Sequence, residues 1–257
     1  MSLKPLQESF NALNFQKFGE IQRNFIITPD KKFIYLSVPK CGCSSVKVFL
    51  RVLYGQPLAD AQSNPHSTDK SPFIVLDNED NVNEMIRFYI SNPGTFVFSL
   101  IRDPRQRVLS AFLNKFKYAD DATRTLFAKQ LFNVCKDDEA LSLAKDLDFG
   151  KFLLNISKCE PLAMNEHWRP MTNQILGLKD HIKLFNLADS NDLFERILKT
   201  KSDSKLSKDF RFTPHSTNSK NLLSDYFTEE AEELFRSIYI DDIKLFSAIS
   251  QQSPQTL

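Results

Sequence analysis

Glycine is scarce in this chain, since only 6 of its 257 residues are glycine. Average usage of about 7% would give roughly three times that number. No two of these glycines lie close together, so the glycine-rich signatures GxGxxG and GxxxxGKS/T occur nowhere in the sequence. If the protein binds a phosphate group, it must therefore do so with a loop of another kind.

Cysteine is scarce as well, because the chain has four, too few for a disulfide scaffold. Only Cys41 and Cys43 are close in sequence. A C-x-C pair without a second nearby pair does not supply the four ligands of a structural zinc site. We therefore expect no bound metal and a reduced, cytoplasmic protein.

Long apolar runs and an excess of one charge are also lacking. No stretch of the sequence approaches the roughly 18 apolar residues that cross a membrane, and the first residues lack the apolar region of a signal peptide. The 33 basic and 32 acidic residues leave a net charge of +1. Because nonspecific nucleic-acid binding requires a basic surplus, we expect no nucleic-acid partner and no transmembrane span. The oligomeric state is left open.

The sequence does contain enough apolar residues for a substantial core, at 42% hydrophobic with 23 phenylalanines. Apolar β-type runs predict strands at 24–28, 32–38, 73–76, 95–101 and 181–187. Helical spacing predicts helices after 45, at 81–90, after 103, across 120–157 with an acidic break at 137–139, at 191–199, at 228–237 and at 239–250. We expect the segments 56–72, 158–180 and 200–221 to be irregular.

The order of these elements predicts an α/β fold with a central, mainly parallel sheet flanked by helices in three layers. The first two strands surround a Pro-Asp turn and predict a hairpin. We expect a single domain over residues 1–257, with a polar lead-in at 1–22 and the core at 23–250.

Polar residues that can bind an anion follow the second expected strand. The loop Pro39–Ser45 contains Lys40, Ser44 and Ser45 and leads into a helix. Backbone N–H groups at a helix N-terminus attract anions, and small residues let the backbone approach one closely. From these residues alone, phosphate binding and simple helix capping both remain open.

A second loop of this kind follows the strand at 95–101. Arg102 ends that strand, Asp103 can cap the next helix with Pro104 in its first position, and Ser110 lies about two turns later. A guanidinium and a hydroxyl can both bond a phosphate. The alternative is an arrangement of Arg102 with Asp103 at the surface and a packing role for Ser110.

The two loops together resemble the phosphate-binding motifs of the carbohydrate sulfotransferase family. Residues 32–47, KFIYLSVPKCGCSSVK, are similar to its 5′-phosphosulfate loop, and residues 98–112, FSLIRDPRQRVLSAF, to its 3′-phosphate site. The branch that includes the chondroitin and HNK-1 type enzymes also carries a His-Trp-Arg-Pro element, here 167–170, and a Tyr-x-x-Asp-x-x-x-Phe-like helix, here 239–246. The resemblance spans roughly residues 30–247.

The resemblance implies a P-loop-like fold and a sulfuryl donor, 3′-phosphoadenosine 5′-phosphosulfate (PAPS), with the product nucleotide PAP. It implies that Lys40 stabilises charge on the leaving phosphate and that a glycan or another hydroxyl-bearing molecule is the acceptor. The residues implied to hold the nucleotide are Lys40, Cys41, Gly42, Cys43, Ser44, Ser45, Arg102, Ser110, Ser219 and Lys220. Since eukaryotic members are usually membrane-anchored Golgi proteins, a trimmed luminal domain is the alternative to a cytoplasmic location.

The acceptor hydroxyl needs a general base, and histidine is the usual agent because its pKa lies near neutrality. We favour His167, which belongs to the His-Trp-Arg-Pro element, with His66 as the alternative, and expect His181 to be structural. Arg169 would suit an anionic acceptor, and Trp168 could either stack on a sugar ring or pack in the core.

Two other functions remain open at this point. One is a catalytically inactive nucleotide-binding module of the same fold, which the joint presence of Lys40, Arg102 and Ser110 disfavours. The other is a P-loop-type phosphotransferase, which the missing glycine-rich cradle disfavours.

Overall fold

The structure is a computed structural model that describes residues 24–67, 69, 71–74, 94–175, 182–200 and 218–251. The helix expected at 81–90 and the expected structural histidine His181 lie outside these described residues. The chain forms two compact units. Unit 1 comprises residues 1–101, 175–214 and 249–257, and unit 2 comprises 102–174 and 215–248. The single domain stays a prediction.

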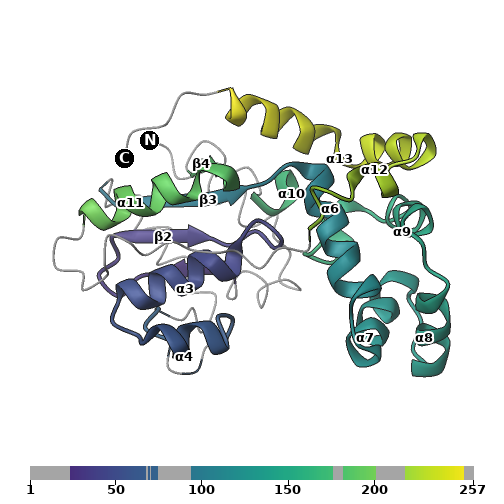
Figure 1. The fold of residues 1–257 in the computed structure, drawn as a ribbon, viewed down its shortest axis with the longest axis horizontal. Helices are drawn as coiled ribbons and strands as arrows, with labels where there is room; N and C mark the ends of the chain where they lie inside the picture. Colours follow the sequence, from purple (N-terminus) through teal and green to yellow (C-terminus); the bar gives the residue numbers. More distant parts are fainter. Residues whose placement is uncertain are drawn as a thin grey trace. The chain divides into compact units, whose positions relative to one another are not determined.

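Unit 1 contains a four-stranded sheet in the order β1-β2-β3-β4. The strands are β1 (Phe25–Ile27), β2 (Phe33–Leu36), β3 (Phe96–Ile101) and β4 (Lys183–Asn186). β1 and β2 form the expected antiparallel hairpin, whereas β2, β3 and β4 run parallel (Figure 1). The prediction of a mainly parallel sheet is therefore confirmed. Of the strand expected at 73–76, residues 73–74 are described, and Ile74 forms an isolated bridge with Ile27.

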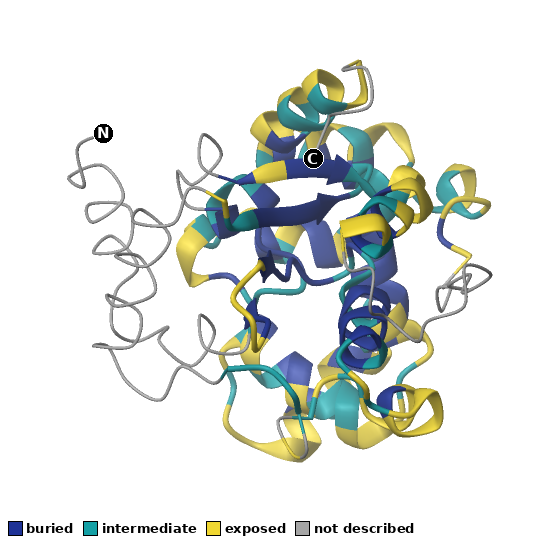
Figure 2. Cartoon of the chain, turned by 90° about the vertical axis from the view of Figure 1, so that its left-hand side faces the viewer, coloured by how far each residue is buried: buried dark blue, intermediate teal, exposed yellow. Residues whose placement is uncertain are grey.

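The central strands are buried along most of their length (Figure 2). All four residues of β2 are buried, as expected for a strand of continuous apolar character that is covered on both faces. The single polar side chain within β3, Ser99, is fully buried. Its hydroxyl donates to the carbonyl of Leu36 on β2 at 2.7 Å, so the polar group does not weaken the core.

The helices of unit 1 follow the strands. They are α3 (Cys43–Leu53), α4 (Leu58–Ser63) and α11 (Ser190–Thr200), and the 3₁₀ turn η5 (Leu187–Asp189) precedes α11. α3 and α11 pack together through the stacked rings of Phe49 and Phe194, whose centroids lie 4.3 Å apart. The expectation that 56–72 is irregular throughout was wrong, because α4 forms there. Its sequence LADAQS contains good helix formers after Pro57, and its Ala61 is buried.

Unit 2 is helical. It contains α6 (Pro104–Phe112), the π-helical turn η2 (Leu113–Lys117), α7 (Asp121–Phe132), α8 (Asp137–Lys145), α9 (Phe149–Ile156), the 3₁₀ turn η3 (Pro161–Ala163), most of α10 (Met171–Ile175), α12 (Leu223–Tyr226) and most of α13 (Glu229–Ser250). The short α10 and η3 lie in a segment that we expected to be irregular. α13 has a non-helical residue, Tyr239, which agrees with the two short helices predicted there.

We had expected the acidic run at 137–139 to break the helical region, but it does not. The helical region is interrupted instead at 133–136, where Asn133 takes a left-handed conformation with φ of 54°, and again at 146–148. The three acids form the first turn of α8. Negative side chains at that position interact favourably with the partial positive charge of a helix N-terminus. The acidic run therefore marks the start of a helix.

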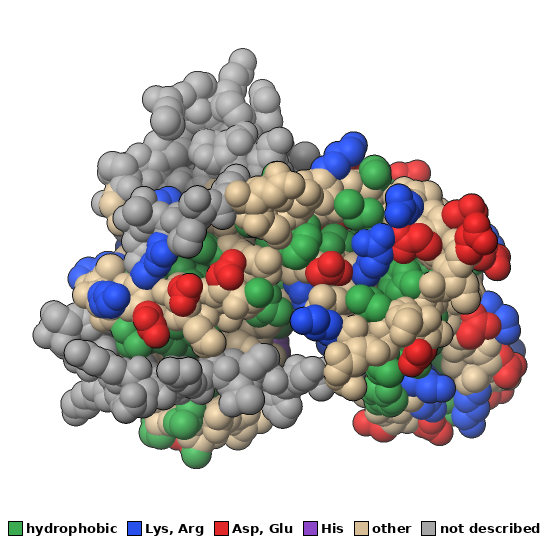
Figure 3. Space-filling model, turned by 45° about the horizontal axis from the view of Figure 1, so that its top comes forward, with side chains coloured by type: hydrophobic (Ala, Val, Ile, Leu, Met, Phe, Trp, Pro, Cys, Tyr) green, Lys and Arg blue, Asp and Glu red, His purple; other side chains and the backbone are tan. Residues whose placement is uncertain are grey.

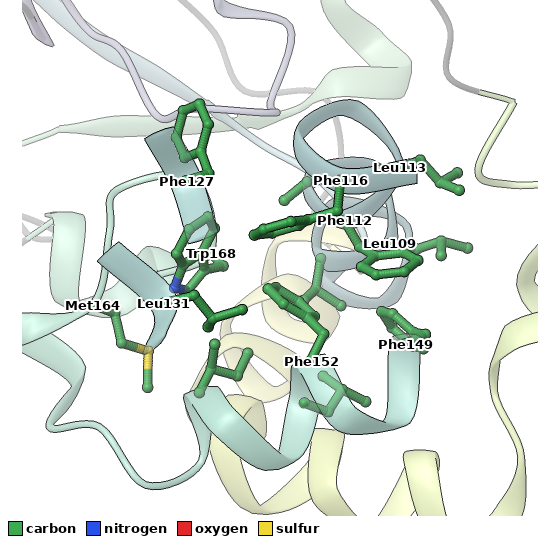
Figure 4. Packing of buried hydrophobic residues seen from close by; sticks show 14 of the residues in the cluster. Leu109, Phe112, Leu113, Phe116, Phe127, Leu131, Phe149, Phe152, Met164 and Trp168 are labelled. Carbon is green, nitrogen blue, oxygen red and sulfur yellow. The ribbon is translucent and has the colours of Figure 1, made fainter. Parts of the chain in front are cut away.

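Aromatic side chains fill the core of unit 2 (Figure 4). Phe112, Phe116 and Phe152 form one group, with ring centroids 5.6 to 6.2 Å apart. Trp168 packs against this group at 6.0 Å from Phe116 and 5.7 Å from Phe152. Such tilted and edge-on pairs add stability beyond the burial of their area.

Three buried polar side chains hold the loop before α10 in place. Arg107 of α6 donates to the carbonyls of Arg169 and Glu166 at 2.8 and 3.1 Å. The Tyr239 hydroxyl donates to the carbonyl of Trp168 at 2.5 Å. Asp242 accepts from three donors at the start of α10. They are the backbone N–H of Met171 at 2.7 Å, the N–H of Thr172 at 2.8 Å and its hydroxyl at 2.9 Å.

The surface carries charges of both signs. On the face drawn in Figure 3, Lys and Arg side chains are interspersed with Asp and Glu side chains. None of the helices in the described ranges combines the length and the apolar composition that a membrane crossing requires.

We predict that Asp242→Asn lowers the free energy of unfolding by roughly 3 kcal/mol, because one of two buried oxygens becomes an NH₂ group facing backbone donors. Burial raises the pKa of the Asp242 carboxyl, while Arg107 and the bonds donated by Thr172 and Met171 lower it. Urea unfolding measures the loss. Asp241→Asn is the matched control, since Asp241 is exposed and pairs with Lys244 at the surface. Equal effects of the two substitutions would contradict the assignment.

Candidate functional site

The loop between β2 and α3 in unit 1 presents a helix N-terminus that no described side chain caps. Two loop residues take the left-handed conformation, Lys40 with φ of 68° and Gly42 with φ of 76°. Val46 is the first residue whose N–H bonds back to the carbonyl of Gly42, at 3.2 Å. The N–H groups of residues 43–45 precede this first helical bond, and such groups favour an anion. The structure thus places the half-buried Lys40 and three backbone amides in one short loop.

Two features favour glycine at position 42. Its positive φ is unfavourable for any residue with a side chain. A Cβ at this position would also lie 2.5 Å from Cδ1 of Leu187, in the turn that follows β4. The close approach of the backbone to a phosphate stays a prediction, and the structure adds a close approach to Leu187.

Tyr35 of β2 lies beneath this loop with a fully buried side chain. Among the described residues its hydroxyl forms no hydrogen bond of normal geometry, although the Ser37 side chain lies close to it. Burial raises the pKa of this phenol well above its usual range, the nearby Cys43 and Cys41 raise it further, and the Ser37 side chain lowers it. Cys41 is buried and Cys43 is half-buried.

His66 contacts the same loop through two residues of α3. Its Nε2 lies 2.8 Å from the Ser44 hydroxyl, and its Nδ1 lies 3.4 Å from the ammonium of Lys47. His66 is exposed, whereas Lys47 is only 6% exposed. Of the residues predicted from the sequence, the structure thus brings Ser44 and His66 together, while the neighbouring Ser45 is buried.

Arg51 holds the segment that carries His66. This arginine is 2% exposed and donates to the side chain of Gln56 at 3.1 Å and to the carbonyl of Ser67. Its guanidinium also lies over the ring of Phe73, 5.8 Å from the centroid. Burial lowers the pKa of Arg51, but an arginine keeps its charge under all physiological conditions.

In unit 2, Arg102 follows β3 directly and donates to the Ser219 hydroxyl at 2.8 Å. Ser219 is fully buried and Lys220 beside it is exposed. As predicted, Asp103 caps α6 by accepting from the N–H of Gln106 at 3.0 Å. Ser110 lies in α6 with its side chain buried. The structure therefore brings together Arg102 and Ser219, which are 117 residues apart in the sequence.

His167 is held by Asn165 two residues earlier. The Asn165 carbonyl oxygen lies 2.8 Å from Nδ1 of His167 and accepts the backbone N–H of His167 at 2.9 Å. The Asn165 amide nitrogen donates to Gln130 at 2.5 Å. Because a carbonyl oxygen only accepts, Nδ1 carries the proton and Nε2 carries the lone pair. The half-buried imidazole also meets the Phe127 ring edge-on, with centroids 5.2 Å apart.

Trp168 and Arg169 are 2% and 5% exposed. The indole lies within the aromatic core (Figure 4), and the Arg169 guanidinium donates to the carbonyl of Met164 at 2.7 and 3.1 Å. In this structure neither side chain presents a surface to a sugar. We therefore assign both to packing, which was one of the two possibilities for Trp168, and leave both out of the proposed acceptor contacts.

Sequence reasoning missed Lys47 and Asn165. A weak signal existed for each, since Lys47 lies three residues after Ser44, on the same face of α3, and Asn165 lies two residues before His167. The spacing of Lys47 does not reveal its contact with His66, which lies on another segment, and the position of Asn165 does not by itself show that its side chain bonds the His167 ring. In the described part of the chain, no group of three or more His, Cys, Asp or Glu residues is arranged to hold a metal ion.

Comparison with known proteins gives consistent matches. The model of the sulfotransferase family matches residues 23–247 of this chain. Carbohydrate sulfotransferase 14 of Danio rerio is 28% identical over 177 residues, covering 67% of this chain and 43% of that protein. The Mus musculus protein of the same name is 30% identical over 149 residues, which are 58% and 38% of the two chains. Carbohydrate sulfotransferase 9 of Homo sapiens is 28% identical over 155 residues, 57% and 34% of the two chains.

This chain spans less than half the length of these relatives. No solved structure matches it.

We predict that Gly42→Ala destabilises unit 1 more than Gly55→Ala does. Gly55 has φ of 92° but open space around its Cα, so alanine there adds only backbone strain of about 1 kcal/mol. Alanine at position 42 adds the same strain and a clash with Leu187, which Leu187→Ala in the same chain should relieve in part. Urea unfolding of the three variants measures this. Equal losses for the two glycine substitutions would contradict the role given to Leu187.

Proposed function

Since this chain belongs to the sulfotransferase family, we propose that it transfers a sulfuryl group from PAPS to a hydroxyl group of a carbohydrate. The observation that carries the proposal is the open N-terminus of α3, preceded by Lys40 and the left-handed Gly42. The acceptor class rests on the relatives, which are named carbohydrate sulfotransferases.

The donors at the two loops fit the charges of this nucleotide. We assign Lys40 and the amides of 43–45, with the Ser44 and Ser45 hydroxyls, to the 5′-phosphosulfate. We assign Arg102, with Ser219, Ser110 and Lys220, to the 3′-phosphate. A guanidinium suits a phosphate because its planar fork gives charge-assisted hydrogen bonds. No metal is needed in this arrangement, because lysine and amide donors supply the positive charge.

The chain's residues would act on both ends of the transferred group. The acceptor oxygen bonds to sulfur while the bond from sulfur to the 5′-phosphate oxygen breaks. Lys40 and the α3 amides stabilise the negative charge that the departing phosphate gains, and such fixed donors are worth several kcal/mol in a transition state. The acceptor proton goes to Nε2 of His167.

His167 suits the role of base better than His66 does. Because Asn165 accepts the Nδ1 proton of His167, its Nε2 can accept another. His66 has Lys47 at Nδ1 and Ser44 at Nε2. An ammonium only donates, so Nδ1 of His66 is the acceptor and Nε2 already holds the proton.

The proposal predicts that PAP stabilises the protein against heat without Mg²⁺, and that radiolabelled sulfate moves from PAPS to a member of a glycan array.

Arg102→Ala should raise the dissociation constant for PAP about 10- to 100-fold, because a charge-assisted bond to phosphate is lost. Arg105→Ala is the matched control, since Arg105 pairs with Glu232 instead. Stabilisation by Mg²⁺-ATP and not by PAP would favour the phosphotransferase. PAP binding without transfer to any acceptor would favour the inactive module.

We predict that His167→Ala lowers kcat about 10²- to 10⁴-fold, the usual range for loss of a general base, while the affinity for PAP stays unchanged. The acidic limb of the pH profile of kcat should disappear with it. Steady-state kinetics and calorimetric titration with PAP separate the two effects. Near-normal turnover by this variant would show that His167 is not the base.

A further inference from the structure

We propose that Lys47 and His66 form a relay, a chain of hydrogen bonds in which Lys47 donates to His66 and His66 donates to Ser44. This relay orients the proton of the Ser44 hydroxyl toward PAPS. This inference rests on the proposed function, because it concerns the same loop. It gives His66 a positioning role at the nucleotide and makes Lys47 part of the site.

The direction of the relay follows from the chemistry of its first member. Lys47 has three N–H donors and no acceptor, so Nδ1 of His66, 3.4 Å away, must be the accepting nitrogen. The proton of the neutral ring is then on Nε2. This N–H points at the Ser44 oxygen, 2.8 Å away, and donates to it.

The opposite tautomer would be unfavourable. It would place the Nδ1–H of His66 against the N–H groups of Lys47, two donors facing each other. Lys47 is 6% exposed, so its charge is poorly solvated and an accepting neighbour is worth more than it would be in water. The lysine thereby selects the histidine tautomer.

The consequence for Ser44 is a directed hydroxyl. Its oxygen already accepts from His66, so its own proton is available for donation to a second group. Ser44 is the second residue of α3, in the turn whose backbone amides precede the first helical bond. The hydroxyl thus adds a donor to those amides where the partial positive charge of the helix is largest.

The relay is anchored along one face of α3. Ser44, Lys47 and Arg51 occur at positions i, i+3 and i+7, which lie on the same face of a helix. The first two contact the His66 ring, and Arg51 donates to the carbonyl of the adjacent Ser67. A single helix therefore holds the ring of an exposed histidine at two points and the backbone of the next residue at a third.

Nitrogen NMR of the ligand-free protein tests the tautomer directly. We expect the His66 signals of a ring protonated at Nε2, and we expect Lys47→Met to shift the population toward the Nδ1–H form. Lys244→Met, a lysine paired with Asp241 on α13, is the control and should leave the signals unchanged. A ring protonated at Nδ1 in the unaltered protein, or no response to Lys47→Met, would overturn the relay.

Calorimetric titration with PAP tests its consequence. We expect Ser44→Ala and His66→Ala each to weaken binding about 10-fold, as loss of one bond to a charged group does, and the double variant to be no weaker than either. Multiplying losses would show that the two residues act separately.

A third readout separates the relay from general-base catalysis. His66→Ala should lower the rate but keep the acidic limb of the pH profile. Loss of that limb with unchanged PAP affinity would make His66 the base and overturn the relay. Failure of the unaltered protein to bind PAP contradicts the proposed function instead, and the NMR experiment still decides whether the relay exists.

Discussion

The chemistry of unit 1 depends on one constraint of helix geometry, which is that the first N–H groups of a helix have no carbonyl of their own helix to bond. α3 begins directly after the left-handed Gly42, with no side chain of the described residues as its cap. The amides of its first turn consequently need a partner from outside the helix. Lys40 and Ser44 add a charge and a hydroxyl to the same turn. An anion would satisfy all of these donors together, so a glycine-poor loop has the groups that the proposed phosphate site requires.

In unit 2, buried polar side chains hold the loop at 166–172 beside the aromatic core. Arg107, Tyr239 and Asp242 bond the main chain of 166–172, using a cation and a hydroxyl for its carbonyls and an anion for its amides. Each buried polar group is matched by one of opposite type, which is the condition for polar groups to be tolerated in a core. Trp168 fixes the loop from its apolar side. His167 therefore stands on a segment whose backbone is held from both sides.

Local sequence signals predicted the parts of the fold that local physics decides. The Pro29-Asp30 hairpin, the buried β2 and β3, and the Asp103 cap of α6 all follow from residues next to one another. α4 was missed because its proline-rich surroundings resemble a loop. The start of α8 was missed because an acidic run both interrupts an apolar pattern and favours a helix N-terminus. Contacts such as Lys47 with His66 join segments far apart in the chain, so no spacing reveals them.

The two candidate histidines show how a neighbour decides a role that the residue type leaves open. In its neutral form each ring has one donor and one acceptor nitrogen, and the sequence offered no means of choosing between the two histidines beyond a motif. A carbonyl oxygen at Nδ1, as Asn165 provides for His167, forces the lone pair onto Nε2. An ammonium at Nδ1, as Lys47 provides for His66, forces the proton of the neutral ring onto Nε2. Under the proposed function, one ring would take a proton and the other would donate a hydrogen bond, so the group at Nδ1, an amide oxygen or an ammonium, distinguishes the proposed base from the proposed binding residue.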